Sequence, residues 1–295
     1  MALRDIILQM NSYPEPTPAW AVDNAAALAS KLGAKLSVGV CQVHIPPVSN
    51  WLANQLINAA GMIAAENQKS AENAKALLSH FSAAVDEGMR GEALLVECTG
   101  MMITYWQLAS RARAYDLLVV PVYGHERTVS LEGLTFETGR PLLLLTEGAQ
   151  NGQFDHVVVG WDGSATAARA LADSLCICAA AKTVKIVVIT GEKDLTPTTP
   201  ASDVIRHLGR HGIAAQAIEI PAAERDAGQA LQAYCMEAGS DLLVMGAYGH
   251  SRVREFVLGG ATKSVLEHPT LPIFSHTDPG SPYRSRHGPA AHRYI

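Results

Sequence analysis

The sequence predicts an α/β protein built from two tandem domains, each an open, doubly wound parallel sheet. Three observations support this fold class. Short continuous apolar runs alternate with helix-like stretches, which is typical of parallel strands covered on both faces. The length of 295 residues suits about two domains of ordinary size. The segment DLLVVPVYGH at 116–125 returns as DLLVMGAYGH at 241–250 with seven of ten positions identical, so the chain contains a repeat.

The repeat sets the expected domain boundaries. Each half opens on an apolar strand, at Ile6 and at Val157, and closes on a strand with a Pro near its start, from Arg140 and from Leu271. We therefore predict one domain at 1–150 and a second at 151–276, joined by the polar stretch 148–153. Residues 277–295 combine Pro, Gly, Ser and charge without an apolar period, so we expect a flexible tail.

The second half shows the alternating pattern most clearly. Strands are predicted at 157–161, 184–190, 214–220 and 241–245, and helices at 165–181, 202–209, 223–239 and after Gly260. The first half follows the same order but contains a long Ala-rich helical region at 50–87. Right-handed crossovers between such strands give a doubly wound sandwich.

Composition excludes several classes of protein. The net charge of −5 leaves no large basic footprint, so we expect no nucleic-acid partner. The five cysteines are odd in number and form no C-x-x-C, so neither a disulfide framework nor a zinc ribbon is expected; Cys98, Cys176, Cys178 and Cys235 are interpreted as small core residues. No run approaches the roughly 20 apolar residues of a membrane helix and no signal peptide is evident, so we expect a cytoplasmic protein without a membrane partner.

The segment GAYGHSRVREFVLGGATKSVLEH at 246–268 is the most informative one for function. Its glycines follow a predicted buried strand and lead into a predicted helix. Glycines there bring backbone N–H groups close to an anion, and a helix that begins at 260–262 points its positive end at a phosphate. Arg252, Arg254 and Lys263 could add positive charge. The spacing alone leaves open the alternative of a surface loop with turn glycines.

A second element is VVVGWDGSATAARAL at 157–171. Asp162 ends the predicted strand, Gly163 turns the chain and Ser164 is placed to cap the next helix. An acidic side chain at a strand end can accept hydrogen bonds from adenine or ribose. The alternative is a strand–turn–helix junction that needs no ligand.

Together, these two elements resemble the universal stress protein family over the whole second half and, in degraded form, over the first. The resemblance implies a Rossmann-like, adenine nucleotide alpha hydrolase-like fold with an open five-stranded parallel sheet. One branch of that family binds ATP or related adenine nucleotides. Tandem members pack two domains in one chain much as separate protomers form a dimer.

The resemblance implies a nucleotide site in the second half. Gly160, Trp161 and Asp162 would border the adenine end, and Ile189 would touch the base. The ribose and phosphates would be lined by Met245, Gly246, Tyr248 and Gly249, with backbone N–H groups from Gly259, Gly260 and Ala261. The family usually has Ser or Thr where Gly260 stands, and Thr262 replaces that hydroxyl only in part. ATP is the expected nucleotide, and Mg²⁺ would accompany its phosphates.

The first half departs from the family pattern. Pro121 stands where the first motif Gly belongs, Asn11 stands in place of Asp162, and six loop residues with the double Gly are missing. Gly124 survives but cannot build a phosphate cradle alone. We predict that this half binds no nucleotide and serves as a partner sheet or a protein-docking surface, for which the region 50–87 is the candidate.

Two functions from different classes remain open at this point. In the first, the protein binds an adenine nucleotide in its second half and acts in stress response through its conformation or an unidentified partner protein. In the second, both sites are degenerate and the protein acts by surface contacts alone. No catalytic residue and no metal site is predicted, and the pair His207 and His211 is interpreted as a solvated helix end. An adenylating enzyme is disfavoured because its Ser-rich loop is absent, and both a monomer and a homodimer remain possible.

Overall fold

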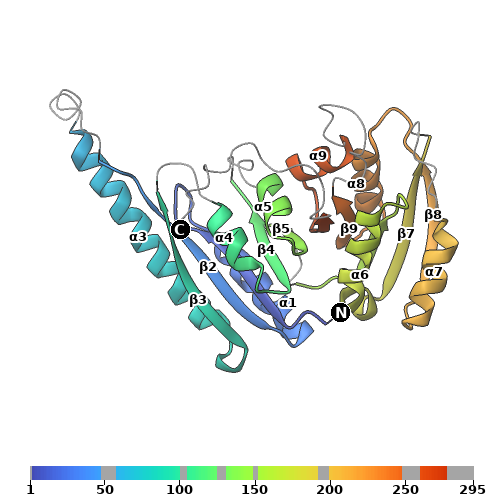
Figure 1. Cartoon of the computed structure of the whole chain (residues 1–295), viewed down its shortest axis with the longest axis horizontal. Helices are drawn as coiled ribbons and strands as arrows, with labels where there is room; N and C mark the ends of the chain where they lie inside the picture. The colour runs from blue at the N-terminus through green and yellow to red at the C-terminus, as the bar shows by residue number, and fades with distance from the viewer. Residues whose placement is uncertain are drawn as a thin grey trace, which may run out of the picture.

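The computed structural model describes residues 2–47, 58–99, 105–124, 131–148, 152–191, 199–247 and 260–277. Across these residues ten strands join into one twisted sheet, in the order β3-β2-β1-β4-β5-β10-β9-β6-β7-β8 (Figure 1). The strands are β1 (Asp5–Asn11), β2 (Lys35–His44), β3 (Arg90–Thr99), β4 (Leu117–Val122), β5 (Leu142–Thr146), β6 (His156–Gly160), β7 (Thr183–Thr190), β8 (Ala215–Pro221), β9 (Leu242–Ala247) and β10 (Ile273–Thr277).

The strand order is the same in the two halves of the chain. Strands β1 to β5 pair in parallel with each other, and so do strands β6 to β10. The halves meet where β10 pairs antiparallel with β5, with Phe274 opposite Leu143. The predicted α/β class with mostly parallel sheets is confirmed, and the two expected sheets are joined edge to edge into one.

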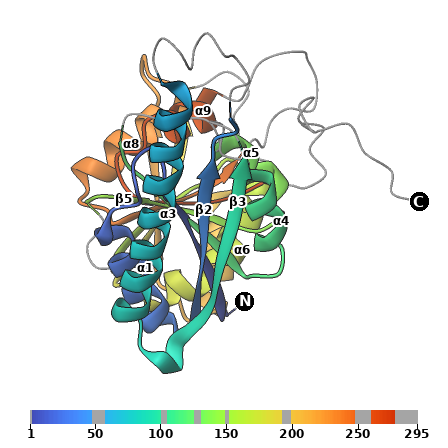
Figure 2. The same ribbon diagram turned by 90° about the vertical axis from the view of Figure 1, so that its left-hand side faces the viewer.

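Helices cover both faces of the sheet. One buried cluster lies under α1 (Ala19–Leu32), α3 (Ala59–Ala84), α6 (Ala165–Ala180) and α7 (Ala201–Arg210). The other lies under α4 (Tyr105–Ala112), α5 (Leu131–Glu137), α8 (Ala227–Glu237) and α9 (Gly260–Glu267). Figure 2 shows α1 and α3 on one side of β2 and β3, with α4 and α5 on the other. Continuous burial along strands such as β1 follows from this double cover.

Most predicted elements of the second half agree with the structure to within a few residues. The main difference is α8, which begins at Ala227 rather than near 223. Asp226 is its N-cap and accepts a hydrogen bond from the Gln229 N–H, so the chain turns before the helix starts. In the first half, the described part of the predicted region 50–87 is α3 followed by a 3-10 turn at Glu87–Met89; residues 48–57 lie outside the described ranges.

A disulfide links neighbouring strands of the first half. Cys41 in β2 and Cys98 in β3 are bonded, with their Cα atoms 6.0 Å apart. The register places Cys41 beside Val96, two positions from Cys98. Cys98 is buried as expected, but the expectation that the cysteines form no disulfide was wrong for this pair. The two cysteines are 57 positions apart in sequence, and only the pairing of β2 with β3 brings them together.

Candidate nucleotide site

The second half has its topological switch point between β6 and β9. Strand β6 pairs with β7 on one side and with β9 on the other, so the chain winds outward in both directions from this pair. In open α/β sheets, ligands bind beyond the carboxyl ends of the strands at such a point. Asp162 follows β6 there, and Gly246 lies near the end of β9. The tertiary structure thus brings two separately predicted segments to one edge of the sheet.

Asp162 is oriented by the turn that starts α6. Its Oδ1 accepts a hydrogen bond from the Ser164 N–H at 2.9 Å, and Ser164 Oγ accepts one from the Ala167 N–H at 3.1 Å. Ser164 is the N-cap of α6, which confirms its predicted role. Its hydroxyl also lies 3.0 Å from that of Thr166. This polar turn holds the Asp162 carboxylate at the end of β6.

Close packing against the start of α6 explains why residue 246 is a glycine. A Cβ at this position would overlap the backbone N of Ala167 and the Thr166 side chain at 2.6 Å. Strand β9 therefore approaches the start of α6 more closely than any residue with a side chain allows. The sequence also led us to expect that Gly246→Val would remove ATP binding and spare the fold; the second part of that expectation is incompatible with this contact.

The expected adenine-side residues fall into two groups. Ile189 and Met245 are buried in the cluster beneath α8, and a Cβ at Gly160 would lie 2.9 Å from Leu231 of the same cluster. Trp161 belongs to the cluster on the opposite face, and its indole N–H donates to the Thr199 carbonyl at 2.9 Å. The indole is thus held in the core and does not share a side of the sheet with Ile189.

The expected phosphate helix is α9, which begins at Gly260. Ala261 and Thr262 lie in its first turn, and the Thr262 side chain is buried. Lys263 forms an exposed i,i+4 ion pair with Glu267, with its Nζ 3.7 Å from Glu267 Oε1. The predicted loop residues Tyr248, Gly249 and Gly259 lie outside the described residues, as do Arg252 and Arg254.

Sequence reasoning missed the residues that fix α9. The Ser264 hydroxyl donates to Asp226 Oδ1 at 2.8 Å, so the N-cap of α8 also binds α9. A Cβ at Gly228 would overlap the Ala261 carbonyl, so the two helices pack backbone against backbone at this point. Asp226 therefore has two structural roles, as the N-cap of α8 and as a hydrogen-bond partner of α9. An Asp before a helix is a recognisable cap signal, but its bond to Ser264 depends on tertiary packing.

The equivalent position in the first half is filled by its own chain. The Thr17 hydroxyl accepts from the Asn11 N–H at 2.8 Å and lies 3.0 Å from the Tyr123 hydroxyl, which also donates to the Glu15 carbonyl. The Glu15 carboxylate packs against Gly124. Burial raises the pKa of Tyr123 in spite of the Thr17 contact. The segment between β1 and α1 thus closes the carboxyl end of β1 and β4.

In the described part of the chain, the remaining features that the sequence raised give no evidence of a further binding site. The His207 and His211 rings meet edge to face with centroids 4.8 Å apart, at the end of α7. Over the described ranges, no three His, Cys, Asp or Glu side chains are grouped so that they could hold a metal ion. None of the described helices is long and apolar enough to cross a bilayer.

Comparison with known proteins agrees with the resemblance of the motifs. The sequence model of the universal stress protein family matches residues 153–274. A curated relative, universal stress protein Slr1230 of Synechocystis, is 41% identical over 49 residues, and that match spans 17% of its length and 17% of this chain.

Solved structures show the same fold over nearly the whole chain. A universal stress protein from Archaeoglobus fulgidus superposes with a TM-score of 0.66 at 18% identity, covering 92% of this chain and 98% of that one. A putative universal stress protein from Pseudomonas aeruginosa gives 0.56 at 12% identity, covering 94% of each chain. Residues 153–274 thus match the universal stress protein family in sequence, and the solved structures share the fold of nearly the whole chain.

Proposed function

We propose that the second half binds an adenine nucleotide, with ATP the expected ligand, and that the protein acts in stress response through its nucleotide-dependent conformation. The observation that carries this proposal is the placement of Asp162 beside β9 at the switch point, in the half that also contains α9. That edge of the sheet is where an α/β fold binds nucleotides.

The roles follow from the chemistry of each group. The backbone N–H groups in the first turn of α9, at Gly260, Ala261 and Thr262, would receive phosphate oxygens. The Asp162 carboxylate would accept hydrogen bonds from ribose or adenine hydroxyl and amino groups. Mg²⁺ would be held by the phosphates, since the described residues offer no carboxylate cluster for it. We assign no residue as a base or nucleophile.

The first half would be a tandem partner domain without nucleotide. Its switch point is closed by the contacts of Thr17, Glu15 and Tyr123, and Pro121 removes a backbone donor from β4. A stoichiometry of one nucleotide per chain follows from this asymmetry.

Ala261→Asp provides a sharp test of the phosphate seat. An acidic residue in the first turn of a helix is favourable for the helix, so the fold should be retained while phosphate is repelled. Ala19→Asp, in the first turn of α1 in the other half, is the matched control. Titration calorimetry with MgATP should give one site per chain, weakened at least tenfold in Ala261→Asp, weakened in Asp162→Ala and unchanged in Ala19→Asp.

The competing function is a protein that acts by surface contacts and binds no nucleotide. The packing of Gly246 against α6 favours it, because this motif glycine has a structural reason that involves no ligand. Absence of binding at millimolar MgATP, or equal affinity in Ala261→Asp and the wild type, would support this second function. Two sites per chain would contradict the assignment of the first half.

A further inference from the structure

The antiparallel pairing of β5 with β10, here called the seam, joins the two halves. Its two sides carry different residue types at one buried position. The pairing of β5 with β10 is centred on Leu143 and Phe274, with Leu144 opposite Ile273 and Leu142 opposite Ser275. This near-twofold relation makes Leu145 and His276 equivalent, since each lies two residues beyond the centre. A leucine on one side of the seam thus corresponds to a histidine that is 3% exposed on the other.

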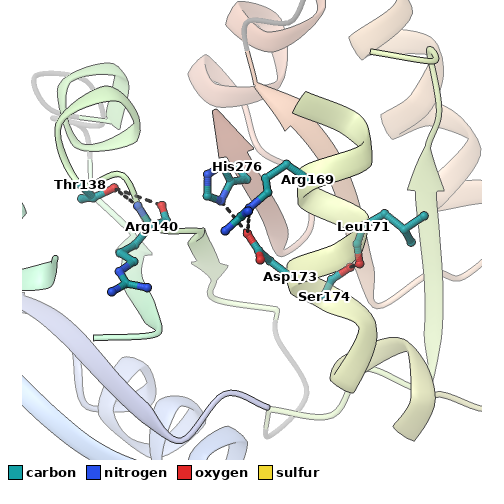
Figure 3. A network of polar contacts seen from close by, with 7 residues as sticks. All are labelled: Thr138, Arg140, Arg169, Leu171, Asp173, Ser174 and His276. Atoms are coloured by element: carbon teal, nitrogen blue, oxygen red, sulfur yellow. Dashed lines mark hydrogen bonds and ion pairs between the residues drawn. The ribbon is translucent and has the colours of Figure 1, made fainter. Parts of the chain in front are cut away.

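His276 in β10 forms a polar cluster with two charged residues of α6, Asp173 and Arg169. Its Nδ1 lies 2.8 Å from Asp173 Oδ2, and that oxygen also accepts a hydrogen bond from Arg169 Nε at 3.0 Å (Figure 3). Burial alone would raise the pKa of Asp173, but His276 and Arg169 hold it below its ordinary value. Burying charged groups costs free energy that a leucine at this position would not cost. Stability alone therefore does not explain why the cluster is present.

The cluster borders a small cavity to which both halves contribute. Its walls are made by Leu3, Asp116, Gly139, Arg140 and Pro141 of the first half and by Arg169, Asp173 and His276 of the second. Figure 3 shows Arg140 on the loop before β5, across from Arg169, Asp173 and His276. Two arginine residues and one histidine therefore line one space.

The two carboxylates of the cavity are already satisfied. Asp116 Oδ2 accepts hydrogen bonds from the backbone N–H groups of Arg4 and Asp5, and Asp173 Oδ2 contacts Arg169 and His276. Arg140 uses its Nε to donate to the Arg113 carbonyl at 3.0 Å. Within the described ranges, the terminal Nη groups of Arg140 and Arg169 and the Nε2 of His276 make no hydrogen bond. These polar groups of the cavity, left without a partner in that part of the chain, are nitrogen atoms rather than carboxylate oxygens.

We propose that this seam cavity binds a small oxyanion, a sulfate-like or phosphate-like ion or a carboxylate, bridged by Arg140 from one half and Arg169 from the other. Guanidinium groups are the preferred partners of such anions. A bound anion would add a link between the halves and stabilise their relative position.

His276 adds a third polar side chain to the cavity. The charged groups around it are Asp173 and Arg169 from α6 and Arg140 and Asp116 from the first half.

Thermal unfolding with sodium sulfate, phosphate, acetate or chloride at constant ionic strength tests the site. We expect sulfate to raise Tm above the chloride value, and the arms with phosphate and acetate to tell an inorganic oxyanion from a carboxylate. Arg140→Gln and Arg169→Gln should lose the increment. Arg206→Gln, which breaks an exposed ion pair on α7, is the matched control and should retain it.

Two further variants separate the possible outcomes. His276→Leu copies the equivalent residue of the first half, removes the imidazole from the cavity and should reduce the sulfate increment. Ala261→Asp removes the proposed nucleotide seat and should leave the sulfate increment intact, so this test is independent of the nucleotide proposal. An increment equal for chloride and all oxyanions, or one that survives in the Arg140→Gln and Arg169→Gln double variant, would overturn the proposal.

Discussion

Asp116 and Asp241 make the same set of hydrogen bonds in the two halves of the protein. Oδ2 of Asp116 accepts from the backbone N–H groups of Arg4 and Asp5, at 2.8 and 3.0 Å. Oδ2 of Asp241 accepts from those of Asp155 and His156, at 3.0 and 2.9 Å. Each carboxylate thus ties the start of one central strand to the start of its neighbour. The first residue of the repeated segment has a structural role that both halves keep.

Replacing either aspartate should destabilise its half. Asp116→Ala or Asp241→Ala leaves two backbone donors without their carboxylate, and we expect a loss of about 1–3 kcal/mol in the free energy of unfolding. Urea denaturation measures it. Asp203→Ala, which breaks an exposed pair with Arg206, is the control and should cost less than about 1 kcal/mol. Equal losses of unfolding free energy in Asp203→Ala and in Asp116→Ala or Asp241→Ala would contradict the role of the two carboxylates in tying neighbouring strands together.

Gly246→Ala should destabilise the protein even without ligand. The added Cβ overlaps the backbone at the start of α6, and we expect a loss of about 1–3 kcal/mol. Gly209→Ala in α7 is the matched control, because no atom lies within 4 Å of its added Cβ and alanine favours a helix. Thermal unfolding of both variants decides the point. A Gly246→Ala protein as stable as the wild type would show that this contact relaxes freely.

Ser264→Ala should weaken nucleotide binding without removing a contact to the ligand. Loss of the bond to Asp226 loosens α9 against α8, and a double-mutant cycle with Asp226→Ala should give a coupling of about 0.5–1.5 kcal/mol. Ser82→Ala in α3 removes a hydroxyl bonded only to the Leu78 carbonyl of its own helix and is the control. Zero coupling would mean that the two helices are held by packing alone.

Alkylation of the native protein at pH 8 without reductant should modify Cys176 alone. Cys41 and Cys98 are bonded to each other, while burial raises the pKa of Cys178 to about 11 and that of Cys235 to about 12. Mass spectrometry of peptides from the labelled protein gives the pattern directly. Label on Cys41 and Cys98 before reduction would contradict the disulfide.

The Asp173 carboxylate should give the second half an acid-sensitive component of stability. Because its pKa is lowered in the folded protein, its contribution is present above the ordinary value of 3.8 and is lost as pH falls toward the lowered one. Unfolding free energies measured between pH 3 and pH 7 should therefore fall less steeply in Asp173→Asn than in the wild type. Parallel pH profiles would show that the pair with His276 makes no net contribution.

The sequence by itself determined the fold class, the order of strands and helices in the second half, and the resemblance of residues 153–274 to a known family. Local rules suffice for these: apolar runs bounded by Gly, Pro and cap residues mark buried strands, and Ser164 before an Ala-rich run marks a helix start. The sequence also showed where the first half departs from the motifs of the second, because Pro121 and Asn11 replace motif residues at equivalent positions.

Only the tertiary structure decided how these parts meet. The pairing of β5 with β10, the Cys41–Cys98 bond and the contact between Asp226 and Ser264 each join segments far apart in sequence. The same holds for Gly246, whose tight approach to α6 no local pattern reveals. Such contacts depend on how whole elements pack, and a pattern along one strand or helix contains no information about its neighbour in space.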